Sequence, residues 1–153
     1  MSPLATIHQQ HRPFVFIEFH NISVNDENFE EYKKEYLQLL VSCKRNNDKI
    51  YLIIDVNQLP ALPIPYLIKQ TELNKQLFNH HQKYLHCAYI YCKSKIFKKM
   101  IEFHLFIEKN AVPVKICRSV EKLNYHIEQN FNVTFDFSLY VSNSNTSIEC
   151  ESE

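Results

Sequence analysis

An aspartate closes an apolar run near the middle of the chain. The run KIYLIIDV spans residues 49–56, and Asp55 stands near its end. A carboxylate at a strand end can serve as a general acid or base when a partner lies within hydrogen-bonding reach, and the neighbouring sequence offers no such partner. The alternative role is structural, because an aspartate after a strand readily accepts hydrogen bonds from backbone N–H groups of the next turn. The sequence favours this structural role for Asp55.

Histidines and cysteines gather between residues 80 and 92, at His80, His81, His86, Cys87 and Cys92. Structural zinc sites usually draw their ligands from two closely spaced pairs of such residues. Cys87 and Cys92 are five positions apart on a predicted strand, which turns their side chains to opposite faces. The two adjacent histidines diverge by about 100° around a helix. The sequence therefore predicts no metal site, and we expect no cofactor.

Four lysines form a basic cluster at Lys93, Lys95, Lys98 and Lys99. Such a cluster can meet an acidic protein, RNA or an anionic lipid surface. It falls at a predicted helix start, where the helix dipole makes cations mildly unfavourable. The alternative is a solvated face with no partner, which is the commoner fate of a charge run.

Composition excludes several classes of function. The 153 residues correspond to one domain, and lysine plus arginine equal aspartate plus glutamate at 17 each, so no whole-chain field attracts nucleic acid, DNA included, or a membrane, and binding to a polyanion would need a local patch. The chain has no glycine, which excludes the phosphate-binding loops of Walker and Rossmann type and the G-x-S-x-G turn of hydrolases. Left-handed turn positions must then fall on Asn or Asp, with candidates at residues 46–48 and at Asn57.

The cysteines and the absence of targeting signals indicate a compartment. Five cysteines form an odd, scattered set, and the opening MSPLATIHQQHRP lacks the basic start and apolar core of a secretory signal. No run approaches the roughly 20 apolar residues that a membrane span needs. We expect a cytoplasmic protein with free thiols and no membrane span.

Strand and helix patterns alternate along the chain. Apolar and β-branched runs predict strands at 13–24, 49–56, 86–92 and 112–117. Helices are predicted to follow each strand, with caps at Asn25 or Asp26, at Ser94 and at Ser119, and with Pro65 at the start of the second. This order predicts a single-domain α/β fold, a mostly parallel open sheet flanked by helices. Ligands of such sheets bind at the carboxyl ends of the strands, where Asp55 stands.

The two ends of the chain read differently from its centre. Residues 1–12 are polar and aperiodic and are predicted to form a flexible leader. The domain is assigned to residues 13–141, in which the alternating segment 133–141 offers an additional C-terminal edge strand. Residues 142–153 are polar and acidic and are predicted to be a disordered tail.

Two helices carry informative apolar stripes. In the first, the stripe that faces the core comprises Phe29, Tyr32, Tyr36, Leu39, Leu40 and Cys43. In the third, the stripe predicted to pack on the sheet comprises Ile96, Phe97, Met100, Phe103 and Ile107. Leu105 and Phe106 fall outside that stripe. They either face a partner or are covered by the last strand or the tail.

The order and spacing of these elements resemble the STAS domain, the fold of bacterial anti-sigma-factor antagonists such as SpoIIAA. The resemblance spans residues 14–130 and rests on LIIDVNQLPALPIPYLI, CKSKIFKKMIEFHLFIEKN and VPVKICRSVEKLNYHI. In that family a D-S-x-G-like turn carries the Ser or Thr that a partner kinase phosphorylates. The corresponding positions here are Pro63, Ile64, Pro65 and Tyr66, so the phosphorylatable hydroxyl is absent.

The resemblance implies a non-enzymatic protein-interaction or regulatory module that binds a protein partner or itself. The residues expected to bind the partner are Leu62, Ile64, Tyr66, Phe97, Leu105 and Phe106. An alternative is a binder of a lipid or another apolar small molecule, which the distantly similar CRAL-TRIO domains suggest. An enzyme has the least support, since it would need a constellation of His, Cys and Asp that the sequence does not reveal.

Overall fold

Five strands form one sheet at the centre of the computed structural model, which describes residues 3–59, 65, 66, 68–70, 72, 73, 76, 84–96, 98, 99, 101, 102 and 113–131. The strands are β1 (Ala5–His8), β2 (Phe14–Phe19), β3 (Ile50–Asp55), β4 (Leu85–Tyr91) and β5 (Val114–Cys117), in the spatial order β1-β2-β3-β4-β5. Strands β2 to β5 run parallel to their neighbours, and β1 pairs antiparallel with β2. The carboxyl ends of the four parallel strands therefore meet at one edge, called here the carboxyl edge.

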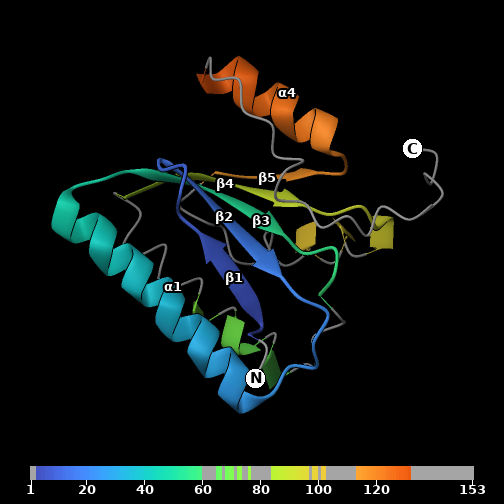
Figure 1. The fold of residues 1–153 in the computed structure, drawn as a ribbon. Coiled ribbons are helices and arrows are strands. Elements are labelled where there is room, and N and C mark those ends of the chain that lie inside the picture. Colours follow the sequence, from blue (N-terminus) through green and yellow to red (C-terminus); the bar gives the residue numbers. More distant parts are fainter. Residues whose placement is uncertain are drawn as a thin grey trace.

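Helices cover both faces of the sheet. Helix α1 (Asp26–Asn46) lies against one face and α4 (Val120–Phe131) against the other, with the strands between them (Figure 1). Two apolar layers result, because β-strand side chains alternate between faces. Val15, Ile17 and Leu52 pack on the α1 side, whereas Phe16 and Ile53 pack on the α4 side.

Helical turns also follow β3 and β4, as the sequence predicts. Residues 65, 66, 68–70, 72, 73 and 76 are helical after β3, and residues 95, 96, 98, 99, 101 and 102 are helical after β4. Leu73 is buried in the layer on the α1 side. No helix in the described part of the chain is long and apolar enough to cross a membrane.

Helix α1 begins and ends at asparagines. The Asn25 side chain accepts a hydrogen bond from the Asn28 backbone N–H at 2.8 Å, and the Asn28 side chain accepts one from the Asn25 N–H at 2.9 Å. This reciprocal pair satisfies N–H groups that a helix start leaves without partners. At the other end Asn47 adopts φ 54°, a left-handed position that glycine commonly fills. The predicted stripe of α1 is buried throughout.

The expectation of a flexible leader over residues 1–12 is wrong for Ala5–His8, which form β1. Ala5 pairs with Phe19 and His8 with Phe16, and Leu4 and Ala5 are almost completely buried. Backbone pairing with β2 and the burial of Leu4 and Ala5 stabilise this strand. The predicted edge strand at 133–141 and the tail at 142–153 lie outside the described residues.

Helix α4 begins where predicted. The Ser119 hydroxyl accepts a hydrogen bond from the Lys122 N–H at 3.1 Å, which caps the first turn. Leu123 and Ile127 then lie on one side of the helix and are fully buried against the sheet.

Candidate functional site

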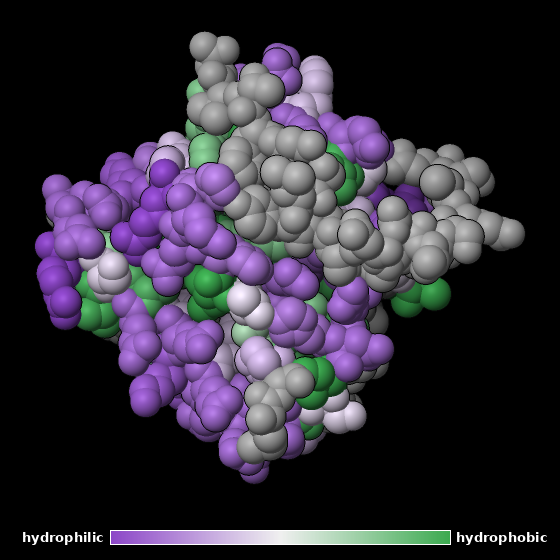
Figure 2. All heavy atoms as spheres, in the orientation of Figure 1, coloured by the Kyte–Doolittle hydropathy of each residue, from purple (hydrophilic) through white to green (hydrophobic). Residues whose placement is uncertain are grey.

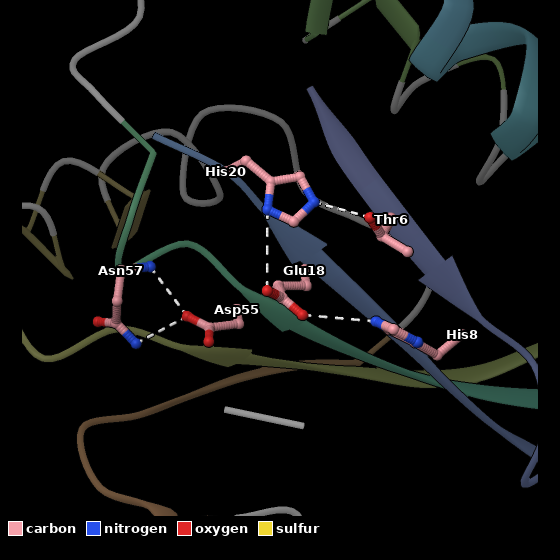
Figure 3. A network of polar contacts seen from close by, with 6 residues as sticks. All are labelled: Thr6, His8, Glu18, His20, Asp55 and Asn57. Atoms are coloured by element: carbon pink, nitrogen blue, oxygen red, sulfur yellow. Dashed lines mark hydrogen bonds and ion pairs between the residues drawn. The ribbon is translucent and has the colours of Figure 1, made fainter. Parts of the chain in front are cut away.

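Asp55 is a structural residue of the turn after β3. Its side chain is 2% exposed, and its Oδ1 accepts hydrogen bonds from the Asn57 backbone N–H at 2.9 Å and from Asn57 Nδ2 at 2.8 Å (Figure 3). An aspartate that bonds the N–H two residues later closes a compact turn without glycine. The structural role favoured by the sequence is confirmed.

The same turn is tied to the ends of β4 and β5. Asn57 Oδ1 accepts a hydrogen bond from the Lys93 backbone N–H at 2.7 Å. The Lys93 carbonyl in turn accepts bonds from Arg118 Nε at 3.3 Å and Arg118 Nη2 at 3.1 Å. Asp55, Asn57, Lys93 and Arg118 therefore form a chain of contacts along the carboxyl edge, and this chain fixes the turns that follow three strands.

A second carboxylate stands beside Asp55. Glu18 pairs with Asp55 in the parallel register of β2 and β3, and both side chains alternate onto the α4 face. Burial raises the pKa of the Asp55 carboxyl, and the charge of Glu18 raises it further, while the hydrogen bonds from Asn57 and the charge of Lys93 act in the opposite direction. The carboxyl edge thus holds a buried acid whose proton is retained more strongly than in water.

Two histidines flank Glu18. His8 Nε2 lies 3.4 Å from Glu18 Oε2, His20 Nδ1 lies 3.7 Å from Glu18 Oε1, and His20 Nε2 lies 2.7 Å from the Thr6 hydroxyl (Figure 3). The order of hydroxyl, imidazole and carboxylate is that of a nucleophile, base and orienting acid. The 3.7 Å separation is longer than a hydrogen bond, however, and Thr6 lies within an edge strand. The arrangement joins β1 to the end of β2.

Sequence reasoning missed this network of Thr6, His8, Glu18 and His20. A weak signal was present, because Phe16, Glu18 and His20 alternate onto one strand face and Glu18 is the charged residue of the run FVFIEF. The contribution of β1 could not be predicted from the sequence, because residues 1–12 as a whole show no strand-like periodicity.

Tyr66 packs against helix α1 of its own chain. Its ring is half-buried and lies 5.7 Å from the Phe29 ring, and its hydroxyl donates to Asp26 Oδ1 at 2.9 Å. Lys69 Nζ also donates to that oxygen, at 3.0 Å. These hydrogen bonds from Lys69 and Tyr66 lower the pKa of the Asp26 carboxyl. The other residues expected to bind a partner lie outside the described residues: Leu62, Ile64, Phe97, Leu105 and Phe106.

The lysine cluster lies at the carboxyl end of β4. Lys93 Nζ stands 5.9 Å from the centre of the Tyr91 ring, and Lys98 forms an ion pair with Glu102 at 3.6 Å. Ile96 is 76% exposed, so the prediction that it packs on the sheet is wrong. The reason is its place in the first helical turn, directly after the loop that leaves the strand, where a helical wheel does not reveal where the sheet ends.

The four described cysteines form no disulfides, and three of them are buried. Cys43, Cys92 and Cys117 are buried and Cys87 is half-buried, all four without disulfides, and burial raises the pKa of each thiol. Within the described ranges no group of three or more His, Cys, Asp or Glu side chains could hold a metal ion. His80 and His81 lie outside those ranges.

A surface hollow of about 750 Å³ runs along the outer side of α1. Leu37 and Val41 supply apolar surface, and charged residues of both signs surround them, including Glu30, Lys34 and Arg45. Figure 2 shows this side of the molecule as mostly hydrophilic, with apolar residues visible between the polar ones. The described residues that line this hollow all belong to α1.

Comparison with known proteins supports the fold. No protein-family model matches the chain, and no curated protein matches it. The crystal structure of an uncharacterized DUF3478-family protein with a SpoIIAA-like fold, from Shewanella loihica PV-4, is similar with a TM-score of 0.59. The similarity covers 79% of this chain and 90% of that chain at 12% sequence identity. The chain therefore has the SpoIIAA-like α/β fold that the sequence resemblance predicts, and identity this low shows the fold alone.

Proposed function

We propose that this protein is a non-enzymatic interaction module of the STAS-like type, which binds a protein partner or a second copy of itself in the cytoplasm. The binding surface in this proposal is the carboxyl edge together with the apolar residues of the following segments. The absence of a hydroxyl at Ile64 means that binding is not controlled by phosphorylation at that position.

The observation that carries the proposal is the structural role of Asp55, whose carboxylate accepts hydrogen bonds within the turn after β3. At a carboxyl edge, a buried acid beside a second carboxylate is the arrangement most suited to acid–base chemistry. Here Asp55 Oδ1 is occupied by two hydrogen bonds from Asn57, and Asn57 continues to Lys93. The acid thus holds the turn, and a turn held in one conformation reduces the entropy lost when a partner binds.

The proposed contact residues are Leu62, Ile64, Tyr66, Phe97, Leu105 and Phe106. Aliphatic and aromatic side chains of this kind supply most of the binding energy of protein interfaces. Tyr66 would contribute through its exposed part while its hydroxyl stays on Asp26.

The test is affinity purification of the full chain, followed by the same experiment on Ile64→Glu and Phe106→Glu. Either substitution is expected to abolish a complex or oligomer that the parent chain forms, with circular dichroism and urea midpoints unchanged. Val41→Glu is the matched control, because Val41 is an exposed apolar residue on α1, remote from the carboxyl edge. Complexes that survive both substitutions, or a parent chain that stays monomeric and without partners, would discard the proposal.

A further inference from the structure

Positive charge is concentrated in two segments, the residues that follow β4 and the stretch from β5 into the first turn of α4. Residues 92–102 and 113–122 contain seven cations and two carboxylates, although the whole chain is balanced at 17 charges of each sign. The cations define a basic patch: Lys93, Lys95, Lys98, Lys99, Lys115, Arg118 and Lys122. The two carboxylates are Glu102 and Glu121.

These cations come from different elements but lie close together. Lys98, Lys115 and Lys122 belong to the helical turns after β4, to β5 and to α4, and all three lower the pKa of the Cys117 thiol against the larger effect of burial. Arg118 is bonded to the Lys93 carbonyl at 3.1 Å. The two basic segments therefore lie side by side, because Lys93 follows β4, Arg118 follows β5, and the two strands are neighbours in the sheet.

An apolar side chain projects beside the patch. Ile96, at 76% exposure, is the most exposed of the large apolar residues in the described part of the chain. Lys95 precedes it in the sequence, and Lys99 follows at i+3, which places Lys99 on the neighbouring part of the helix surface. An exposed aliphatic tip next to lysines can enter an apolar phase while its neighbours stay at a charged boundary.

We propose that the basic patch docks this protein on the surface of an anionic lipid bilayer, with Ile96 inserted at the level of the headgroups. Six of the seven cations are lysines, which attract diffuse negative charge, whereas paired recognition of a single phosphate or carboxylate favours arginine. The one arginine, Arg118, already donates to a backbone carbonyl. Tyr91, whose ring centre lies 5.9 Å from Lys93 Nζ, is buried and so gives no stacking surface for the bases of a nucleic acid.

The lipid surface shares the carboxyl edge with the protein partner proposed above, but its test contains lipid and this chain alone, so the two proposals can fail separately. The full chain is mixed with vesicles of phosphatidylglycerol and phosphatidylcholine in equal parts, or of phosphatidylcholine alone, and the bound fraction is measured by flotation. Binding is expected to the anionic vesicles only, and to weaken as salt is raised.

Three variants locate the contact. The charge reversal Lys95→Glu/Lys99→Glu is expected to weaken binding by at least about tenfold, since each basic residue near an anionic surface contributes several-fold. Ile96→Ser is expected to weaken it by several-fold with the salt dependence unchanged. Lys33→Glu/Lys34→Glu, with the same charge change on α1, is the matched control and is expected to bind like the parent. Circular dichroism and urea midpoints establish that each variant is folded.

Four outcomes overturn the proposal. They are absence of binding to anionic vesicles, equal binding to neutral vesicles, equal loss in the control variant, and binding to a uridine oligonucleotide by a chain that ignores the vesicles. The last outcome would assign the basic patch to nucleic acid.

Discussion

Glu18 and Asp55 lie opposite one another at the carboxyl ends of two parallel strands, on the same face of the sheet. The neighbouring strands place their carboxyl groups in one small region, and Asp55 is almost completely removed from water. Both desolvation and the charge of Glu18 favour the protonated form of Asp55. This relationship makes the stability of the fold depend on pH in a defined direction.

Asp55→Asn is expected to flatten that pH dependence. Because the pKa of Asp55 is raised in the folded state, its contribution to stability is complete below the unfolded pKa of about 3.9 and is lost as pH rises through the folded pKa. The asparagine keeps an Oδ1 that can accept both bonds from Asn57 but has no charge. The free energy of unfolding of the variant should therefore gain on the parent as pH rises, by about 1.4 kcal/mol for each unit of pKa elevation.

Urea unfolding of both proteins across a pH series measures this difference. Glu128→Gln, at an exposed position of α4, is the charge-matched control, because it removes one carboxylate that is not buried. Parallel curves for Asp55→Asn and the parent would contradict the assigned burial effect.

Asn57→Ala is expected to lower the free energy of unfolding by about 2 kcal/mol, at roughly 1 kcal/mol for each hydrogen bond lost. The substitution removes the bond that Asn57 Nδ2 donates to Asp55 and the bond that Asn57 Oδ1 accepts from the Lys93 N–H. The Asn57 backbone N–H remains, so its bond is lost only if the turn opens. Denaturant titration measures the loss, with Gln38→Ala on the exposed side of α1 as the control. A loss no greater than that control would mean that the chain of contacts along the carboxyl edge is not stabilising.

Asn47 occupies the left-handed position that ends helix α1, a position that glycine commonly fills in other proteins. At φ 54° a side chain with a Cβ is crowded, and asparagine tolerates this conformation better than alanine. Asn47→Ala is therefore expected to cost about 1 kcal/mol, and Asn47→Gly to leave stability equal or slightly higher. Thermal unfolding of the pair decides, with Asn46→Ala, in the preceding helical position, as the control. Equal losses for alanine and glycine would show that backbone strain is not the cause.

Lys69→Met is expected to raise the pKa of Asp26 towards its ordinary value. The hydrogen bond from Lys69 is the largest cause of the lowered pKa, and the bond from Tyr66 comes next, so part of the shift should remain in the variant. Carboxyl titration by NMR follows Asp26 directly. As the control, Lys122→Met on α4 should leave the titration of Asp26 unchanged. If the pKa of Asp26 is the same in Lys69→Met as in the parent, the ion pair between Lys69 and Asp26 does not form in solution.

Much of the architecture was predictable because its signals are local. The stripe from Phe29 to Cys43 repeats at the helical period, and Asn25 and Ser119 cap the helices that follow them. Strands β3 and β4 are apolar runs of ordinary strand length, as expected for strands buried on both faces. Each of these features depends on residues within a few positions of one another.

The missed features depend on contacts between distant residues. β1 exists because Ala5 and Thr6 pair with Phe19 and Glu18, and nothing in ATIH alone predicts that pairing. The same pairing places Thr6 and His8 beside Glu18. For Ile96 the sequence predicted burial that the structure does not show. Its apolar character favours burial, but its position beyond the end of β4 leaves it exposed.

Because α1 and α4 lie on opposite faces of the sheet, a substitution in one apolar layer should leave the packing of the other layer unchanged. Leu40 and Leu123 are each fully enclosed, but in two apolar compartments that the five strands keep apart. Truncating either leucine should relax only its own compartment, since the two side chains belong to separate apolar clusters. The double variant should then lose the sum of the single losses, and the strand layer would insulate one half of the interior from the other.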